Sequence, residues 1–116
     1  MKISMPRGDI RNVQFTVTDK NGKTFDTDFT EIYFTCKKFF SDRDYLFQKS
    51  LSGETIIKEA DGVYRFTIES ADTDYLDFGV YVFDIELVYG DKIKQTIVGT
   101  LTLTNEATHV RNERET

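Results

Sequence analysis

The groups with the clearest chemistry in this sequence are carboxylates that alternate in two short triplets. Asp26-Thr27-Asp28 and Asp72-Thr73-Asp74 each place one residue between two carboxylates. Alternating carboxylates in a loop can bind Ca²⁺, which takes about six to eight oxygen ligands. We favour a different interpretation, in which these side chains cap a helical turn and bond the backbone of turns. Neither triplet continues into the glycine and distal glutamate of a dedicated calcium loop. We therefore expect no cofactor and no metal, the weak metal candidates being Asp26, Asp28, Asp72 and Asp74.

Candidates for nucleophilic or acid–base catalysis are scarce. The sole histidine, His109, lies in a polar terminal segment, and such a group rarely works outside a formed pocket. Cys36, the sole cysteine, is in phase with Ile32 and Phe34, where a thiol is usually an inert core side chain. The sequence has no catalytic triad, phosphate-binding loop or Cys/His metal spacing. We expect no catalytic residues and a structural or binding module in place of an enzyme.

Length, charge and hydropathy limit the classes of partner. The 116 residues match one ordinary domain. A net charge of -5 argues against a nucleic-acid partner, because such proteins normally carry a basic face. No apolar run is long enough to cross a bilayer, and the first residues lack the apolar region of a signal peptide. We expect a soluble protein, made in the cytosol, that binds neither nucleic acid nor membrane.

The elements that would position these residues are strands, because apolar side chains recur at every second position. Asp61-Gly62 and Tyr89-Gly90-Asp91 are hairpin signals. Gly99 predicts a bulge or a close backbone approach within its strand. One helical turn is expected at 70–76, with Ser70 as its cap. Strands are expected at 12–18, through Thr24 and Phe25, and at 31–38, 45–49, 55–59, 63–69, 80–88 and 92–104.

These short strands predict an all-β fold, an antiparallel immunoglobulin-like β-sandwich of about seven or eight strands with one short helical turn. A small barrel is the alternative, because periodicity does not distinguish two packed sheets from one closed sheet. We expect a single domain over residues 1–108 and a polar tail over 109–116. The side chains expected to share the interior are Phe15, Phe34, Phe66, Phe83 and Ile97.

Aromatic residues near the predicted loops are candidates for interaction. Phe39, Phe40, Tyr45 and Tyr89 could form a patch that docks a protein or stacks on a sugar. Aromatic residues of a β-domain are more often core, so the alternative is that they are buried. Arg7-Gly8-Asp9 matches an integrin-recognition triplet, but three residues recur by chance, and we expect it to shape the start of the first strand.

The order of several segments carries a resemblance to a known family. They are Arg7-Gly8-Asp9, Val13-Gln14-Phe15-Thr16-Val17, Asp19-Lys20-Asn21-Gly22-Lys23, Ile32-Tyr33-Phe34, Asp61-Gly62-Val63-Tyr64-Arg65-Phe66-Thr67-Ile68, Asp72-Thr73-Asp74-Tyr75-Leu76, Gly79-Val80-Tyr81-Val82-Phe83-Asp84-Ile85-Glu86-Leu87 and Thr96-Ile97-Val98-Gly99-Thr100-Leu101-Thr102-Leu103.

In this order the segments resemble small proteins and N-terminal domains encoded by tailed phages and prophages of Gram-positive bacteria, including the N-terminal domain of baseplate upper proteins. The resemblance covers residues 7–108. It implies an immunoglobulin-like sandwich in a virion tail or baseplate that packs against other subunits and performs no chemistry. Two features depart from the family. The chain ends soon after the sandwich, so we expect no receptor-binding C-terminal domain, and residues 39–49 are unusually charged.

The leading hypothesis is a non-enzymatic phage or prophage structural accessory protein that acts by protein–protein contacts through sheet edges and exposed loops. Its partners would be other virion subunits or a second copy of the chain. It would be made in the bacterial host cytoplasm and be found in the virion if it is incorporated. The alternative is a carbohydrate-binding or adhesion module, assisted by calcium at an Asp-Thr-Asp triplet. An enzyme that works on carboxylates such as Asp72 and Asp84 is the third hypothesis.

Overall fold

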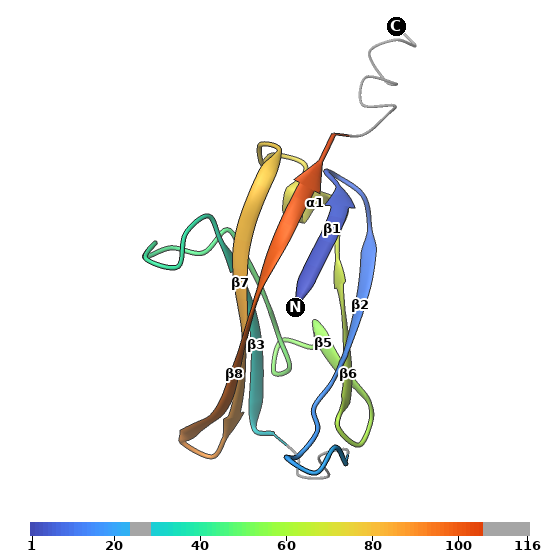
Figure 1. Cartoon of the computed structure of the whole chain (residues 1–116), viewed down its shortest axis with the longest axis vertical. Coiled ribbons are helices and arrows are strands. Elements are labelled where there is room, and N and C mark those ends of the chain that lie inside the picture. Colours follow the sequence, from blue (N-terminus) through green and yellow to red (C-terminus); the bar gives the residue numbers. More distant parts are fainter. Residues whose placement is uncertain (24–28, 106–116) are drawn as a thin grey trace, which may run out of the picture.

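Eight strands and one helical turn follow one another in residues 1–23 and 29–105, which are the residues that the computed structural model describes (Figure 1). The strand predicted through Thr24 and Phe25, the candidates Asp26 and Asp28, and the predicted tail with His109 lie outside them. The elements are β1 (Lys2–Pro6), β2 (Arg11–Thr16), β3 (Glu31–Lys37), β4 (Phe47–Ser50), β5 (Ile56–Ala60), β6 (Val63–Ile68), α1 (Ser70–Thr73), β7 (Gly79–Tyr89) and β8 (Lys92–Thr104).

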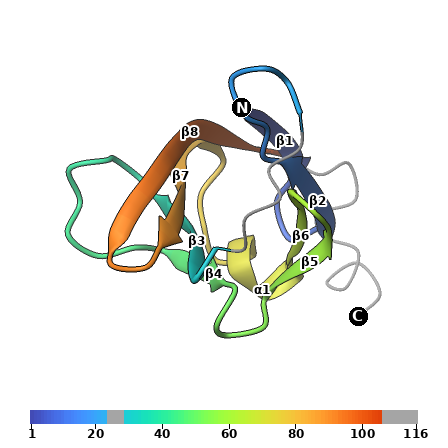
Figure 2. The same cartoon turned by 90° about the horizontal axis from the view of Figure 1, so that it is seen from below.

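The strands form two sheets that face each other. The five-stranded sheet has the order β1-β8-β7-β3-β4, and the three-stranded sheet has the order β2-β6-β5. Figure 2 shows β3, β4 and β7 on one side of the interior and β2, β5 and β6 on the other. Apart from the parallel β1–β8 pair, the ladders are antiparallel. The prediction of an immunoglobulin-like sandwich is confirmed, since β2, β6 and β5 correspond to strands B, E and D of that fold.

Aromatic rings fill the space between the sheets. Phe15, Phe34, Phe66 and Phe83 are buried as predicted. The Phe34 ring centroid lies 4.4 Å from that of Phe66 in the opposite sheet and 4.8 Å from that of Phe83. These contacts occupy the interior where antibody domains have a disulfide and a tryptophan. The fifth predicted core residue, Ile97, is only half-buried and packs at the margin of the core, outside the part of β8 that pairs with β1.

Strand β1 was not predicted. Ile3 and Met5 are buried and alternate with exposed Lys2 and Ser4, but the pattern is short. Its partner is the last strand, so the stabilising contacts come from residues almost a full chain length away. At Gly99 of that partner strand, a Cβ atom would collide with the Met1 carbonyl oxygen and the Phe83 ring. Gly99 therefore marks the predicted close backbone approach.

The β6–β7 connection begins with α1 and ends in a tyrosine corner. The prediction of Ser70 as the cap is wrong, because the N-cap is Glu69, whose N–H donates to Asp72 Oδ2 at 2.8 Å. Glu69, one position before Ser70, can serve as the N-cap because its side chain and that of Asp72 form a capping box. The helix ends at Thr73, earlier than expected. Further on, the Tyr81 hydroxyl donates to the Asp77 carbonyl at 2.8 Å, a bond typical of immunoglobulin-like strand F.

The Arg7-Gly8-Asp9 turn is anchored to this connection. Gly8 N–H donates to Thr73 Oγ1 at 2.9 Å, and Thr73 is fully buried. The Arg7 guanidinium donates to the Leu76 carbonyl at 3.3 Å and lies 4.4 Å from the centroid of the Phe78 ring. These contacts explain the triplet as a support for the chain reversal between β1 and β2, in agreement with the structural interpretation of the sequence.

Candidate binding site

The β3–β4 loop, residues 38–46, carries three of the four predicted interaction residues. It extends sideways from the five-stranded sheet, away from β2, β5 and β6 (Figures 1 and 2). Phe39, Phe40 and Tyr45 are 59%, 53% and 53% exposed, so they are surface residues and not core. Tyr89 is 52% exposed but ends β7, whose other end adjoins the loop. The structure therefore groups the first three and separates Tyr89 from them.

Asp42 gives the loop a defined shape. Its carboxylate accepts a hydrogen bond from the Phe39 N–H at 3.0 Å, and its own N–H donates to the Phe39 carbonyl at 3.0 Å. The Lys37 ammonium donates to the Asp42 carbonyl at 2.8 Å. At the base, the Leu46 N–H donates to the Cys36 carbonyl at 2.8 Å. The clustered charge that breaks the strand pattern at this point thus stabilises the turn that presents the aromatic rings.

A groove of about 320 Å³ lies between this loop and the outer face of the five-stranded sheet. The β3–β7 register builds it, because Tyr33 lies opposite Glu86 and Thr35 opposite Asp84. These residues alternate with the buried ones, so they share the outer face. We call this the loop groove. It is lined by Tyr33, Thr35, Lys37, Arg43, Tyr45, Gln48, Asp84 and Glu86.

Several polar side chains of the loop groove have no partner among the residues that the structure describes. Within the part of the chain that the structure describes, the side chains of Tyr33, Arg43, Tyr45, Asp84 and Glu86 make no hydrogen bond or ion pair. Burial raises the pKa of the Asp84 carboxyl, and the positive charge of Lys37 partly opposes this. Gln48 is engaged, since its amide donates to Thr35 Oγ1 at 2.9 Å. The loop groove therefore offers two tyrosine rings beside donors and acceptors that remain available to a ligand.

Large exposed apolar side chains gather at the end of the sandwich from which the loop leaves. The Lys38 ammonium connects them, as it donates to the Val80 carbonyl at 3.3 Å and lies 5.9 Å from the Phe39 ring centroid. The Tyr75 hydroxyl donates to the Leu46 carbonyl at 2.9 Å and so joins the α1 side to the loop. We call this surface the apolar end. It comprises the exposed side chains of Phe39, Phe40, Tyr75, Phe78 and Val80.

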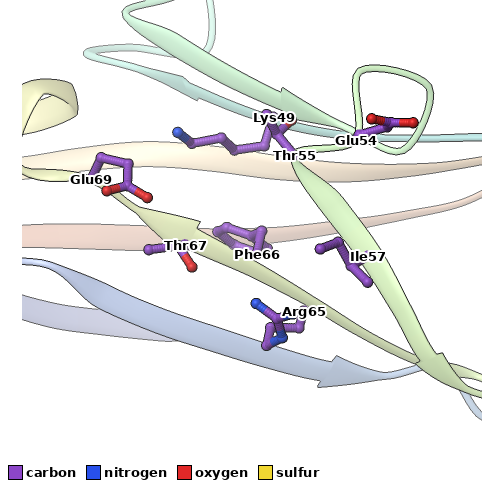
Figure 3. A pocket seen from close by; sticks show the side chains of 8 residues that line it. All are labelled: Lys49, Glu54, Thr55, Ile57, Arg65, Phe66, Thr67 and Glu69. Carbon is purple, nitrogen blue, oxygen red and sulfur yellow. The ribbon is translucent and has the colours of Figure 1, made fainter.

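A second cleft, of about 230 Å³, opens between β4 and β5 on the side of the sandwich (Figure 3). We call it the β4–β5 cleft. Lys49 points into it from β4, and its ammonium forms an ion pair with Asp72 at 2.7 Å. Arg65, which also lines it, forms an ion pair with Glu59. The cations of this cleft are therefore already neutralised by carboxylates of the same chain.

The surroundings of Asp72, Asp74 and Cys36 do not favour metal binding or nucleophilic chemistry. Asp72 is engaged by Lys49 and by the Glu69 N–H, while Asp74 is exposed. In residues 1–23 and 29–105, no three His, Cys, Asp or Glu side chains are grouped as metal ligands. Cys36 is fully buried, which raises the pKa of its thiol to about 12, with a further contribution from the charge of Asp72. A thiol in this state is protonated at neutral pH and a poor nucleophile.

The loop groove was not predicted from the sequence, although the alternation of residues showed which side chains of each strand face outward. Tyr33, Thr35 and Lys37 form the outward face of one predicted strand, but nothing local indicates that Asp84 and Glu86 lie beside them.

None of the helices in the described residues is long and apolar enough to cross a membrane. Neither the models of known protein families nor the curated protein sequences contain a match for this chain.

Proposed function

We propose that this chain is a non-enzymatic structural accessory protein of a phage or prophage tail or baseplate, which docks other virion subunits through its apolar end and β3–β4 loop. The observation that carries the proposal is the exposure of Phe39 and Phe40 on a loop that Lys38 joins to the start of β7, where exposed Phe78 has the Arg7 guanidinium over its ring. Aromatic residues and arginine are enriched in protein interfaces and supply most binding hot spots.

The exposed rings can supply enough free energy for a specific contact. Phe39 and Phe40 each leave more than half of their surface in water. Burying one such ring contributes on the order of 2 kcal/mol. The hydrogen bonds around Asp42 hold the loop before a partner arrives, so less conformational entropy is lost on binding. A virion subunit with a complementary apolar surface is the occupant that we propose.

Docking through the loop is favoured over addition of a strand to either edge of the five-stranded sheet, from which the loop leaves. The edge strand β4 has four residues and carries the inward-pointing charge of Lys49. At the other edge, β1 ends in Pro6, and its Ser4 carbonyl already accepts a bond from Arg11 at 3.0 Å. Short edges, proline and inward charges are the features by which proteins prevent strand addition. The proposed contact is therefore made by side chains of the loop and the apolar end.

The virion context and the absence of catalysis rest on separate supports. The virion context is supported by the order of segments, which resembles that of phage tail and baseplate domains. We therefore propose that the chain is made in the host cytoplasm and is then incorporated into the virion. The non-enzymatic part is supported by the only cysteine, because the buried Cys36 thiol has a pKa of about 12. The exposed aromatic side chains are then available for contacts between subunits.

The test uses purified tail and baseplate proteins encoded by the neighbouring genes. Each is mixed with the full chain and examined by size-exclusion chromatography with light scattering. We expect a defined complex with at least one of them, and we expect the double variant Phe39→Ala, Phe40→Ala to lose it. Tyr89→Ala is the matched control, because Tyr89 is equally exposed but lies at the opposite end of β7. A chain that stays monomeric with all these proteins, or a double variant that binds as well as the parent, contradicts the proposal.

A further inference from the structure

We infer that the loop groove binds a neutral saccharide, with the rings of Tyr33 and Tyr45 against the C–H face of a sugar and Asp84, Glu86 and Arg43 bonded to its hydroxyls. This site takes Arg43 and Tyr45 from the same loop as the docking surface proposed above, but it does not use Phe39, Phe40 or the apolar end. Its central observation is that one groove of about 320 Å³ is lined by five polar or amphipathic side chains that have no partner among the described residues. That volume is at the small end of ligand sites, which span about 300–1,000 Å³, and suits one or two sugar rings.

The chemistry of the lining matches the two kinds of surface that a pyranose presents. A sugar ring has an apolar face of C–H groups and an edge of hydroxyls, each of which both donates and accepts hydrogen bonds. Tyr33 and Tyr45 supply flat apolar rings with a hydroxyl at the tip. The carboxylates of Asp84 and Glu86 accept from sugar hydroxyls, and the Arg43 guanidinium donates to them. A saccharide can therefore satisfy the polar side chains of the groove while covering its rings.

The balance of charge favours a neutral ligand. The groove has two cationic side chains, Lys37 and Arg43, and two carboxylates, Asp84 and Glu86. The Lys37 ammonium is held by the Asp42 carbonyl, which leaves Arg43 as the cation without a partner in the described residues. A phosphate or sulfate in the groove would meet the two carboxylates as well as the two cations, so the repulsion by the carboxylates offsets the attraction. A polyhydroxylated neutral molecule meets no such repulsion.

The groove is largely organised before a ligand arrives. Tyr33 belongs to β3, which pairs with β4 on one side and with β7 on the other. Asp84 and Glu86 belong to β7, which lies between β3 and β8. Arg43 and Tyr45 come from the loop that Asp42 braces against the Phe39 backbone and Lys37. Groups fixed on paired strands lose little freedom on binding, which favours a measurable affinity for a small ligand.

The first experiment is a glycan array probed with the full chain, with and without a calcium chelator. Hits are then titrated as free oligosaccharides into ¹⁵N-labelled protein, together with maltotriose, chitotriose, galactose and rhamnose. We expect chelator-independent binding with a Kd on the order of 1 mM, which corresponds to about -4 kcal/mol. The amide resonances that shift should belong to Tyr33, Thr35, Gln48 and Asp84, which line the groove. No array signal and no shift of these resonances with any of these sugars overturns the inference.

Variants separate this site from the protein-docking surface. Tyr45→Ala and Asp84→Asn should each weaken saccharide binding at least tenfold while the amide spectrum shows a folded protein. Phe39→Ala with Phe40→Ala should leave saccharide binding unchanged and abolish only the docking of virion subunits. Tyr89→Ala should affect neither. Saccharide binding that persists in both groove variants, or that maps to Tyr89, places the sugar elsewhere and contradicts the inference.

Discussion

The β4–β5 cleft and the loop groove lie on opposite sides of the same edge strand, β4. Lys49 points from β4 into the cleft, and the adjacent Gln48 points into the groove. Both are lined by cationic, acidic and hydroxylated side chains, and their volumes are about 230 and 320 Å³. The two sites differ in how these charges are used.

In the cleft, Lys49 is paired with Asp72 and Arg65 with Glu59. In the groove, Arg43, Asp84 and Glu86 have no such partner among the described residues. Charges that are paired within the fold serve stability and the protection of an edge, whereas unpaired groups beside aromatic rings remain available for a ligand. Substitutions in the cleft should therefore change the free energy of unfolding, and substitutions in the groove should change binding.

The largest effect is expected for Asp72→Ala. The side chains of Lys49 and Asp72 are 10% and 17% exposed, and the substitution leaves the Lys49 ammonium without its carboxylate. It also removes the acceptor of the Glu69 N–H at the start of α1. We expect urea denaturation to show a loss of about 3 kcal/mol in the free energy of unfolding. Saccharide binding by the folded fraction should be unchanged.

Asp74→Ala is the matched control for this variant. Asp74 belongs to the same triplet, but its side chain is exposed and makes no hydrogen bond or ion pair in the described residues. Its removal should change the free energy of unfolding by less than about 0.5 kcal/mol. Equal effects of the two substitutions would show that the Lys49–Asp72 pair does not stabilise the cleft.

The next largest effect is expected for Tyr33→Ala, and it should be on binding. Removal of the ring takes away one of the two apolar surfaces of the groove. Saccharide affinity should fall about tenfold, which corresponds to about 1.4 kcal/mol. Tyr33→Phe keeps the ring and loses only a hydroxyl that has no partner in residues 1–23 and 29–105, so affinity should fall by a smaller factor and stability should be unchanged. NMR titration and urea denaturation of both variants measure the two effects separately.

If the groove were structural like the cleft, Tyr33→Phe would lower the free energy of unfolding, and Tyr33→Ala would lower it without a change in affinity. That result would remove the contrast between the two sites.

A smaller effect is expected for Asp84→Asn, and it should raise the free energy of unfolding, whereas Asp72→Ala lowers it. The reason is that burial raises the pKa of the Asp84 carboxyl above its ordinary value. The folded state then holds the proton more tightly than the unfolded chain. The Asp84 contribution therefore makes the protein less stable as the pH rises through these two pKa values, and the loss is complete above the folded one. At neutral pH the variant should be more stable than the parent by up to about 0.5 kcal/mol, although it binds saccharide more weakly.

The measurement is the difference in the free energy of unfolding between parent and variant from pH 3 to 7. We expect this difference to vanish at the acidic end, where the carboxyl is protonated in both states. The charges that face Asp84 are Lys37 and Arg43 on one side and Glu86 along β7. A variant that is less stable than the parent at pH 7 would show that attraction to Lys37 outweighs burial.

The sequence allowed the sandwich to be predicted where its signals are local. Alternation marks the buried faces of β3, β6 and β7, and Asp61-Gly62 marks the β5–β6 hairpin, in which Gly62 has a φ of 74°. Strand β1 was not predicted, because its alternating pattern is short and the strand is stabilised by pairing with β8 at the other end of the chain. The capping residue of α1 also depended on a contact, that of Glu69 with Asp72, which neighbouring residue types alone did not distinguish from a cap by Ser70.

In the candidate site, too, sequence analysis found the features that have a local signal and missed those that depend on contacts between strands. The sequence placed Phe39, Phe40 and Tyr45 near a loop and left open whether they are exposed or buried, and the structure shows that they are exposed. The groove was not predicted, because Tyr33 and Glu86 become neighbours only through the register of β3 and β7. Each looked like the ordinary solvent-facing residue of its own strand. Alternation gives the face on which a residue lies but not the strand beside it.

The smallest effect is expected for Arg65→Ala, the second ion pair of the cleft. The side chains of Arg65 and Glu59 are 37% and 41% exposed, so water already solvates both charges. We expect a loss of about 0.3 kcal/mol in the free energy of unfolding, which should disappear in 1 M salt. The loss caused by Asp72→Ala should persist in the same salt, because its ion pair is shielded from solvent. Urea denaturation of both variants at low and high salt makes this comparison. A large, salt-resistant loss for Arg65→Ala would mean that pairing itself stabilises the cleft regardless of burial, and the distinction drawn between its two pairs would be wrong.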